Sequence, residues 1–113
     1  MHEMALAESI VELVRDQASR DAFARVRTIR LSIGVLSHVE PRALEFGFDV
    51  VAKGTVAQGA RLAIERPAGT GWCTDCSETI DVAARGDECP RCGGHKWMLT
   101  GGDEMRVVEL EVD

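Results

Sequence analysis

The sequence predicts an α+β fold, in which two helices pack on a small, mostly antiparallel three-stranded sheet that carries an inserted four-cysteine domain of the zinc-ribbon type. Two observations predict this architecture. Apolar residues follow a helical period in two stretches and a period of two in three others. All four cysteines lie in one internal segment. We therefore expect an α+β domain over 1–67 and 103–113 and an inserted metal-binding domain over 68–102.

The first helix is predicted over residues 4–18. Apolar residues recur there at intervals of three and four, at Met4, Ala7, Val11, Val14 and Ala18. Ile10 and Leu13 widen this apolar stripe. Acidic residues occupy the other side, at Glu8, Glu12 and Asp16. This spacing is typical of an amphipathic helix packed on a sheet.

A strand, a second helix and a second strand follow. Alternation over 26–34 places Ile29, Leu31 and Ile33 on one face. The second helix is predicted over 41–52, since Pro41 suits a first helical turn. Its apolar face contains Leu44, Phe48 and Val51, and a short strand around Leu62 and Ile64 then ends at Pro67.

The composition changes after Pro67. Residues 68–72 are predicted to be a linker, and the cysteine segment 73–99 is closed by Gly101-Gly102. Alternation then resumes at the end of the chain, with Val108, Leu110 and Val112 on one face. This strand is too apolar to stand alone, so we expect it to return to the first sheet. The cysteine segment would then be an insertion between two neighbouring strands.

Composition excludes several functions. The chain of 113 residues is 45% hydrophobic and 28% charged, which allows a packed core. Aromatic residues make up 4%, and the net charge is −6, so we expect no nucleic-acid partner. No segment approaches the roughly 20 apolar residues that span a bilayer, and the N-terminus resembles no signal peptide. We therefore expect a cytoplasmic protein with no membrane partner.

The four cysteines form two CxxC motifs, Cys73/Cys76 and Cys89/Cys92, which twelve residues separate. Two thiolates on one tight turn can occupy adjacent corners of a tetrahedron, and the second turn can supply the other two. The spacing therefore predicts a structural Zn(II) site. Since the segment is too short for a sufficient core, metal binding worth roughly 10–16 kcal/mol would fold it.

Three other readings of the cysteines stay open: two disulfides, a redox dithiol, and a rubredoxin-like iron site. A closed four-thiolate site has no open position for hydrolysis, so a zinc ion bound there would be structural or regulatory. The sequence also lacks GxxxxGK[ST], GxGxxG and HExxH motifs, so it offers no parts for nucleotide hydrolysis or zinc proteolysis.

Among the three histidines, His2 is placed to bind a metal together with main-chain nitrogens at the start of the sequence. His38 is expected to be a solvated loop residue, and His95 a polar residue beside the second CxxC motif or a supplementary ligand. The Met1 amine, the main-chain nitrogens of His2 and Glu3, and the His2 imidazole could gather around one metal. Four nitrogens in a plane suit Ni(II) or Cu(II).

Several segments together resemble the HypA/HybF family of nickel-incorporation accessory proteins. They are MHEMALAESI, RLSIGVLSHVEPRALEF, GTVAQGARLAIE, the paired CxxC motifs and GGDEMRVVELEV, which span essentially the whole chain. The resemblance implies that nickel is bound at His2, with Glu3 beside it and Glu40 as a further ligand. It also implies that zinc is bound by Cys73, Cys76, Cys89 and Cys92.

This resemblance implies a metallochaperone and not an enzyme. It would take up Ni(II) as cargo and deliver it to the large-subunit precursor of [NiFe]-hydrogenase, with a HypB-type GTPase as partner, and it would be a monomer or a homodimer. Two other classes stay open from the residues alone. A zinc-ribbon adaptor would bind only protein partners, and a rubredoxin-like electron carrier would bind iron.

Overall fold

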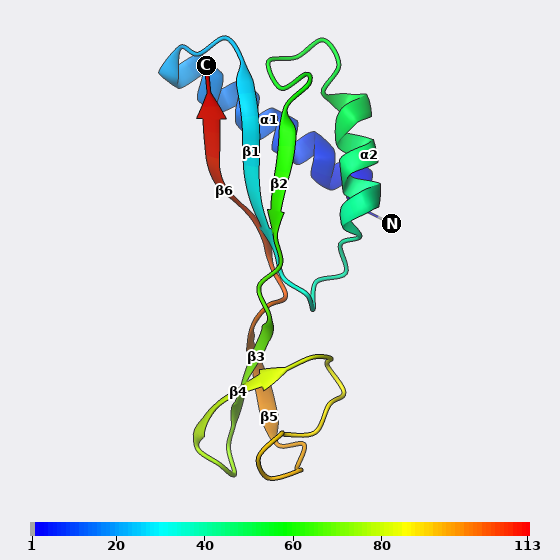
Figure 1. Cartoon of the computed structure of the whole chain (residues 1–113), viewed down its shortest axis with the longest axis vertical. Helices are drawn as coiled ribbons and strands as arrows, with labels where there is room; N and C mark the ends of the chain where they lie inside the picture. Colours follow the sequence, from blue (N-terminus) through cyan, green and yellow to red (C-terminus); the bar gives the residue numbers. More distant parts are fainter. Residues whose placement is uncertain (1) are drawn as a thin grey trace. The chain divides into compact units, whose positions relative to one another are not determined.

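The computed structural model describes residues 2–113, and its helices and strands follow the predicted order (Figure 1). The elements are α1 (Glu3–Asp21), β1 (Val26–Ile33), α2 (Pro41–Val51), β2 (Arg61–Glu65), β3 (Gly69–Cys73), β4 (Glu78–Val82), β5 (Trp97–Gly101) and β6 (Met105–Val112). The strands form two three-stranded sheets, in the orders β2-β1-β6 and β4-β3-β5. The predicted α+β class is therefore confirmed.

The chain divides into two compact units. The helical unit comprises Met1–Leu31, Val39–Ile64 and Arg106–Asp113, and the cysteine unit comprises Ser32–His38 and Glu65–Met105. The functional domains predicted from the sequence have other bounds and stay a prediction.

Aliphatic side chains from three elements form the core of the helical unit. Its buried members include Ala7, Ile10, Val11 and Val14 of α1, Ile29 and Leu31 of β1, and Leu44 and Phe48 of α2. Two residues predicted on the buried face of the first helix, Met4 and Leu13, are instead each 43% exposed. The apolar stripe is wider than the surface that α1 covers, so its margins remain in contact with water.

β1 is the central strand of its sheet, with β2 on one side and β6 on the other. The last strand therefore returns to the first sheet, as predicted. However, β2 and β6 are not neighbours, so the expected insertion between adjacent strands is wrong. Most residues of β1 are buried, as is expected for the central strand of a sheet.

Hydrogen bonds at the strand ends give the strand directions. The Asp113 amide donates to the Arg25 carbonyl (3.3 Å), and the Gly34 amide donates to the Glu104 carbonyl (2.9 Å), so β1 and β6 are antiparallel. Figure 1 shows β2 and β6 pointing in opposite directions, so β2 runs parallel to β1. A parallel pair needs a crossover connection, and α2 lies in that connection.

β3 occupies the stretch that the sequence analysis assigned to a linker. It pairs antiparallel with both β4 and β5, and Cys73 lies opposite Glu78 and Trp97. Two glycines caused the wrong assignment, because glycine is usually depleted in strands. At Gly71 an added Cβ would lie 2.7 Å from Cε3 of Trp97, so the close approach of that ring requires glycine.

Candidate metal centres

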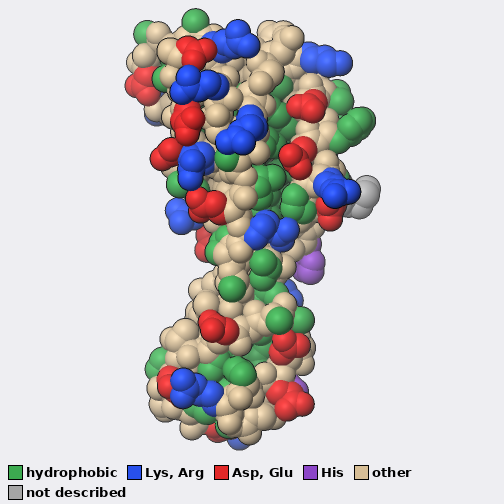
Figure 2. Space-filling model, viewed as in Figure 1, with side chains coloured by type: hydrophobic (Ala, Val, Ile, Leu, Met, Phe, Trp, Pro, Cys, Tyr) green, Lys and Arg blue, Asp and Glu red, His purple; other side chains and the backbone are tan. Residues whose placement is uncertain are grey.

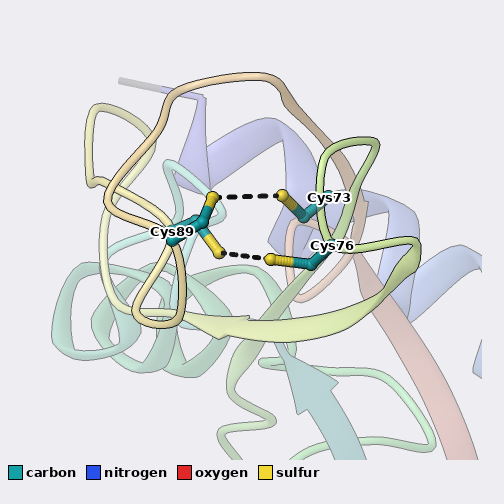
Figure 3. A group of neighbouring side chains, drawn as sticks. Cys73, Cys76 and Cys89 are labelled. Carbon is teal, nitrogen blue, oxygen red and sulfur yellow. Dashed lines mark hydrogen bonds between the residues drawn. The ribbon is translucent and has the colours of Figure 1, made fainter.

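The four cysteine thiols lie together in the cysteine unit. Their sulfur atoms are all within 4.8 Å of one another, with 3.8 Å between Cys73 and Cys92 and 3.9 Å between Cys76 and Cys89. Figure 3 shows the side chains of Cys73 and Cys76 pointing toward Cys89. A tetrahedral zinc site with Zn–S bonds near 2.3 Å has S–S edges of about 3.8 Å. The observed separations fit such a site.

Each CxxC motif lies on a turn that presents its two thiols on the same side. Cys73 ends β3, and Ser77, just after the first motif, has a left-handed backbone with φ of 51°. Gly93 takes the corresponding left-handed conformation after the second motif, with φ of 73°. In that turn the Gly93 amide donates to the Cys89 carbonyl, and the Cys89 amide donates to the Gly94 carbonyl (both 2.8 Å).

Polar contacts that the sequence analysis missed hold the two turns together. The Thr74 amide and hydroxyl both donate to the Lys96 carbonyl, at 3.0 and 2.8 Å. Arg91, inside the second motif, forms a 2.9 Å ion pair with Glu78. In the sequence, Thr74 and Arg91 are the only visible signals of these contacts, because their partners are set by the tertiary arrangement of the loops.

Backbone amides and burial act in opposite directions on the thiols. The backbone amide of Cys92 is the largest influence that lowers the pKa of Cys89 to about 7, and the amide of Arg91 adds to it. Loss of hydration on burial is the largest influence that raises the pKa of Cys76 to about 12, and the neighbouring thiols add to it. Cys89 therefore ionises more readily than Cys76, and a cation bound between the two thiols would stabilise the thiolate form of both.

A closed four-thiolate arrangement is suited to structure and not to hydrolysis. All four tetrahedral positions can be filled by protein sulfur, which is typical of a structural zinc site. Cys73 and Cys89 are also part of the small apolar core that this unit has, together with Ile80 and Val82. A zinc ion bound here would connect the turns to that core. The exposed His95 is not part of the cysteine cluster.

The predicted nickel ligands begin at Met1, which lies outside the described residues. His2 is exposed and directly precedes α1, and its carbonyl accepts a hydrogen bond from the Leu6 amide (3.0 Å). Its side chain makes no capping hydrogen bond to the helix. A helix leaves the amides of its first turn without helical partners, so the main-chain nitrogens here do not take part in hydrogen bonds within the helix. This geometry leaves the imidazole available to a metal.

Glu3 and Glu40 meet through the backbone of Glu40. The Glu3 side chain is 8% exposed, and its carboxylate accepts a hydrogen bond of 3.0 Å from the Glu40 amide. The Glu40 carboxylate accepts from the Arg42 amide (3.1 Å) and so caps the start of α2. Both carboxylates thus have structural partners. A role as nickel ligand would have to compete with these hydrogen bonds.

Within residues 2–113, the four cysteines are the only cluster of three or more histidine, cysteine, aspartate or glutamate side chains that could hold a metal. His2, Glu3 and Glu40 do not form such a cluster there, and His38 is exposed in the loop before α2. The nickel residues therefore stay a prediction. In the same part of the chain, no helix has both the length and the apolar character to cross a membrane.

Comparison with known proteins identifies the family. The profile for hydrogenase/urease nickel-incorporation metallochaperones, HypA, matches residues 1–112. Hydrogenase maturation factor HypA 2 of Bradyrhizobium diazoefficiens is 52% identical, and hydrogenase maturation factor HypA of Albidiferax ferrireducens is 53% identical. Both alignments cover all of this chain and all of the relative.

Solved structures agree on the fold. The solution structure of the nickel metallochaperone HypA from Helicobacter pylori has a TM-score of 0.69 at 23% identity, over 99% of this chain and 97% of that one. Another HypA solution structure has a TM-score of 0.75 at 24% identity, over 99% and 96%. With nickel incorporation as the description of the matching family and a four-thiol cluster that fits zinc, the chain belongs to the HypA family of nickel-incorporation metallochaperones for hydrogenase maturation.

Proposed function

We propose that this protein binds Ni(II) at its N-terminus through His2 and delivers it to the large-subunit precursor of [NiFe]-hydrogenase. One observation carries the proposal. His2 presents an exposed side chain, without a capping bond, directly before α1 in a chain that matches a nickel-incorporation family over residues 1–112. Ligands at a chain end can leave one at a time, which suits a protein that must release its metal.

A HypB-type GTPase is the proposed partner for the nucleotide-driven step. This chain has no GxxxxGK[ST] motif, so it lacks the phosphate-binding loop that such a step needs. The metallochaperone itself would then not be an enzyme, since its work is binding and release of a cation.

In this proposal, residues 1–67 and 103–113 serve nickel, and residues 68–102 bind structural zinc. Cysteine thiolates must stay reduced to bind the metal, so the proposed compartment is the cytoplasm. Glu3 would support the site from the base of α1. Glu40 would contribute only if its carboxylate left the Arg42 amide.

Nickel titration by calorimetry tests the proposal. The protein is untagged and zinc-loaded, and it is compared with His2→Ala and with His38→Ala. His38 is a matched control, because it is also an exposed histidine outside regular structure. We expect His2→Ala to lose one nickel site, while His38→Ala keeps it and all three proteins hold the same zinc.

Equal nickel binding by His2→Ala and the unmodified protein would contradict the proposal. Loss of nickel together with loss of zinc would place the nickel at the cysteines instead. An iron-containing, coloured protein as purified would favour the electron carrier. No nickel site in any variant would favour a zinc-ribbon adaptor.

A further inference from the structure

An apolar groove lies between α1 and β6 in the helical unit. It has a volume of about 430 Å³ and is lined mainly by Leu13, Phe23, Val108, Leu110 and Val112. Three of these side chains are well exposed: Leu13 and Val108 at 43% each, and Val112 at 40%. Contiguous exposed apolar surface of this kind is typical of interaction sites.

The groove exists because α1 does not fully cover β6. Strand alternation places Val108, Leu110 and Val112 on one face of β6, and none of these three side chains is buried. In Figure 1, α1 crosses behind the sheet at an angle to its strands. The space beside α1, over the edge strand, is left without a helix. A segment that packed there would complete the helical layer of the sheet.

Acidic side chains border the groove. Asp21 of α1 contributes to its wall, and so does Glu109 of β6, whose carboxylate forms an ion pair with Arg30 at 3.6 Å. Along the neighbouring surface of α1, a depression that shares Leu13 and Gln17 with the groove is lined by Glu8, Glu12 and Asp16, and by one basic residue, Arg20. The whole chain carries a net charge of −6. This side of the unit therefore favours a cationic partner.

The charges on β1 and β6 are arranged differently. Arg27 and Arg30 form ion pairs there with Glu109, Glu111 and Asp113, at 3.5 to 4.0 Å. Figure 2 shows basic and acidic side chains intermixed over β1 and β6. The acidic residues along α1 are accompanied by one basic residue in the depression that they line. Negative charge on α1 thus lies beside the exposed apolar surface of the groove.

We propose that this groove binds an amphipathic helix of a partner protein, with apolar side chains at helical spacing and lysine or arginine on its flanks. A helix fits because the site lies in the helical layer, beside α1, where apolar anchors at i, i+3, i+4 and i+7 could enter it. An added strand would instead pair beyond the edge of β6 and leave the groove empty. The inference does not depend on where nickel binds.

Charge argues against a second copy of this chain as the occupant. A two-fold interface brings the same surface of both copies together. Two copies joined at this groove would bring the acidic surface around Asp21 and α1 of one copy close to the same acidic surface of the other. Like charges facing each other disfavour such an interface. A basic helix has the complementary charge.

A synthetic peptide provides the probe. It is a fluorescent helix of about 20 residues with leucine at i, i+3, i+4 and i+7 and lysine on both flanks, and its control carries glutamate in place of lysine. Fluorescence anisotropy is measured with the full, zinc-loaded protein. We expect the lysine peptide to bind, the glutamate peptide to bind at least about tenfold more weakly, and added salt to weaken binding.

Variants locate the binding. Val108→Lys should weaken binding of the lysine peptide by at least about tenfold, since it places a charge in the groove. Val50→Lys is the matched control, because Val50 is an exposed valine (46%) on α2, and it should bind the peptide normally. Asp21→Lys replaces an exposed residue at the border, whose carboxylate accepts a hydrogen bond from the Gln17 side chain (2.8 Å), and it should weaken peptide binding while the protein stays folded. Nickel binding should be the same in all three, which separates this inference from the proposed function.

Three outcomes would overturn the inference. Equal weakening by Val50→Lys and Val108→Lys would mean that the peptide does not bind at the groove. Equal binding of both peptides would remove the argument from charge. A dimer in sedimentation equilibrium that Val108→Lys dissociates would show that a second copy occupies the groove.

Discussion

The two units of this protein contain different sources of stability. The helical unit buries aliphatic and aromatic side chains from α1, β1 and α2 around Phe48 and Ile29. The apolar cluster around the cysteines is small, and two of its four buried members, Cys73 and Cys89, are candidate metal ligands. The first unit can fold by removing apolar surface from water. The second has little such surface to remove.

Because of this difference, we expect the cysteine unit, and not the helical unit, to depend on a metal for its folding. Burial of a large aliphatic or aromatic side chain contributes about 1.5–3 kcal/mol, so many such residues are needed to offset the entropy of ordering the chain. In the cysteine unit, a zinc ion bound by four thiolates supplies about 10–16 kcal/mol at one point. Three experiments test this contrast, and they run from the largest expected effect to the smallest.

Removal of zinc should unfold the cysteine unit and leave the helices in place. Both tryptophans, Trp72 and Trp97, lie in β3 and β5, so tryptophan fluorescence reports on this unit alone. Helical circular dichroism reports on the other unit, because α1 and α2 both belong to it. Treatment with a strong chelator, or the change Cys89→Ser, should abolish the folded fluorescence signal and preserve most of the helical signal. Simultaneous loss of both signals would show that the two units fold as one.

Truncation of the buried Phe48 should destabilise the helical unit and leave the cysteine unit folded. Phe48 is 1% exposed, so Phe48→Ala should lower the free energy of unfolding by about 3–5 kcal/mol through lost burial and a cavity. Phe46 on the same helix is 70% exposed, and Phe46→Ala should change stability by no more than about 0.5 kcal/mol. Denaturation followed by helical dichroism measures both. A loss of zinc in Phe48→Ala would contradict the separation of the two cores.

Relief of local strain should give the smallest effect. Ser77 has φ of 51°, a left-handed conformation that suits glycine, and Gly93 occupies the matching place in the second turn. Ser77→Gly should stabilise the zinc-loaded unit by up to about 1 kcal/mol. Thr79→Gly, in the adjacent strand β4, should destabilise it by about 0.5–1 kcal/mol. Resistance of the tryptophan signal to chelator and heat distinguishes the two, and equal effects would remove the argument from strain.

Local patterns predicted much of the fold and the clustering of the four cysteines. The helical spacing located α1 and α2, and the alternation located β1 and β6. Prediction failed where a neighbour decided the outcome. Gly71 lies in a glycine-rich stretch that predicted a loop, but it is part of β3. Glycine is required there because the ring of Trp97 packs directly against it. Met4 and Leu13 belong to the apolar stripe, but nothing in the described structure covers them fully.

The amino-acid sequence by itself determined the ligand chemistry, because a CxxC spacing places two thiols on one turn whatever surrounds it. It also determined the positions of the helices, because amphipathic periodicity is a local property. Tertiary structure alone decided that Glu3 binds the Glu40 amide 37 residues away and that β1 lies between β2 and β6. It alone left the groove beside α1 uncovered. Such contacts depend on which distant segments meet, and no local pattern encodes that.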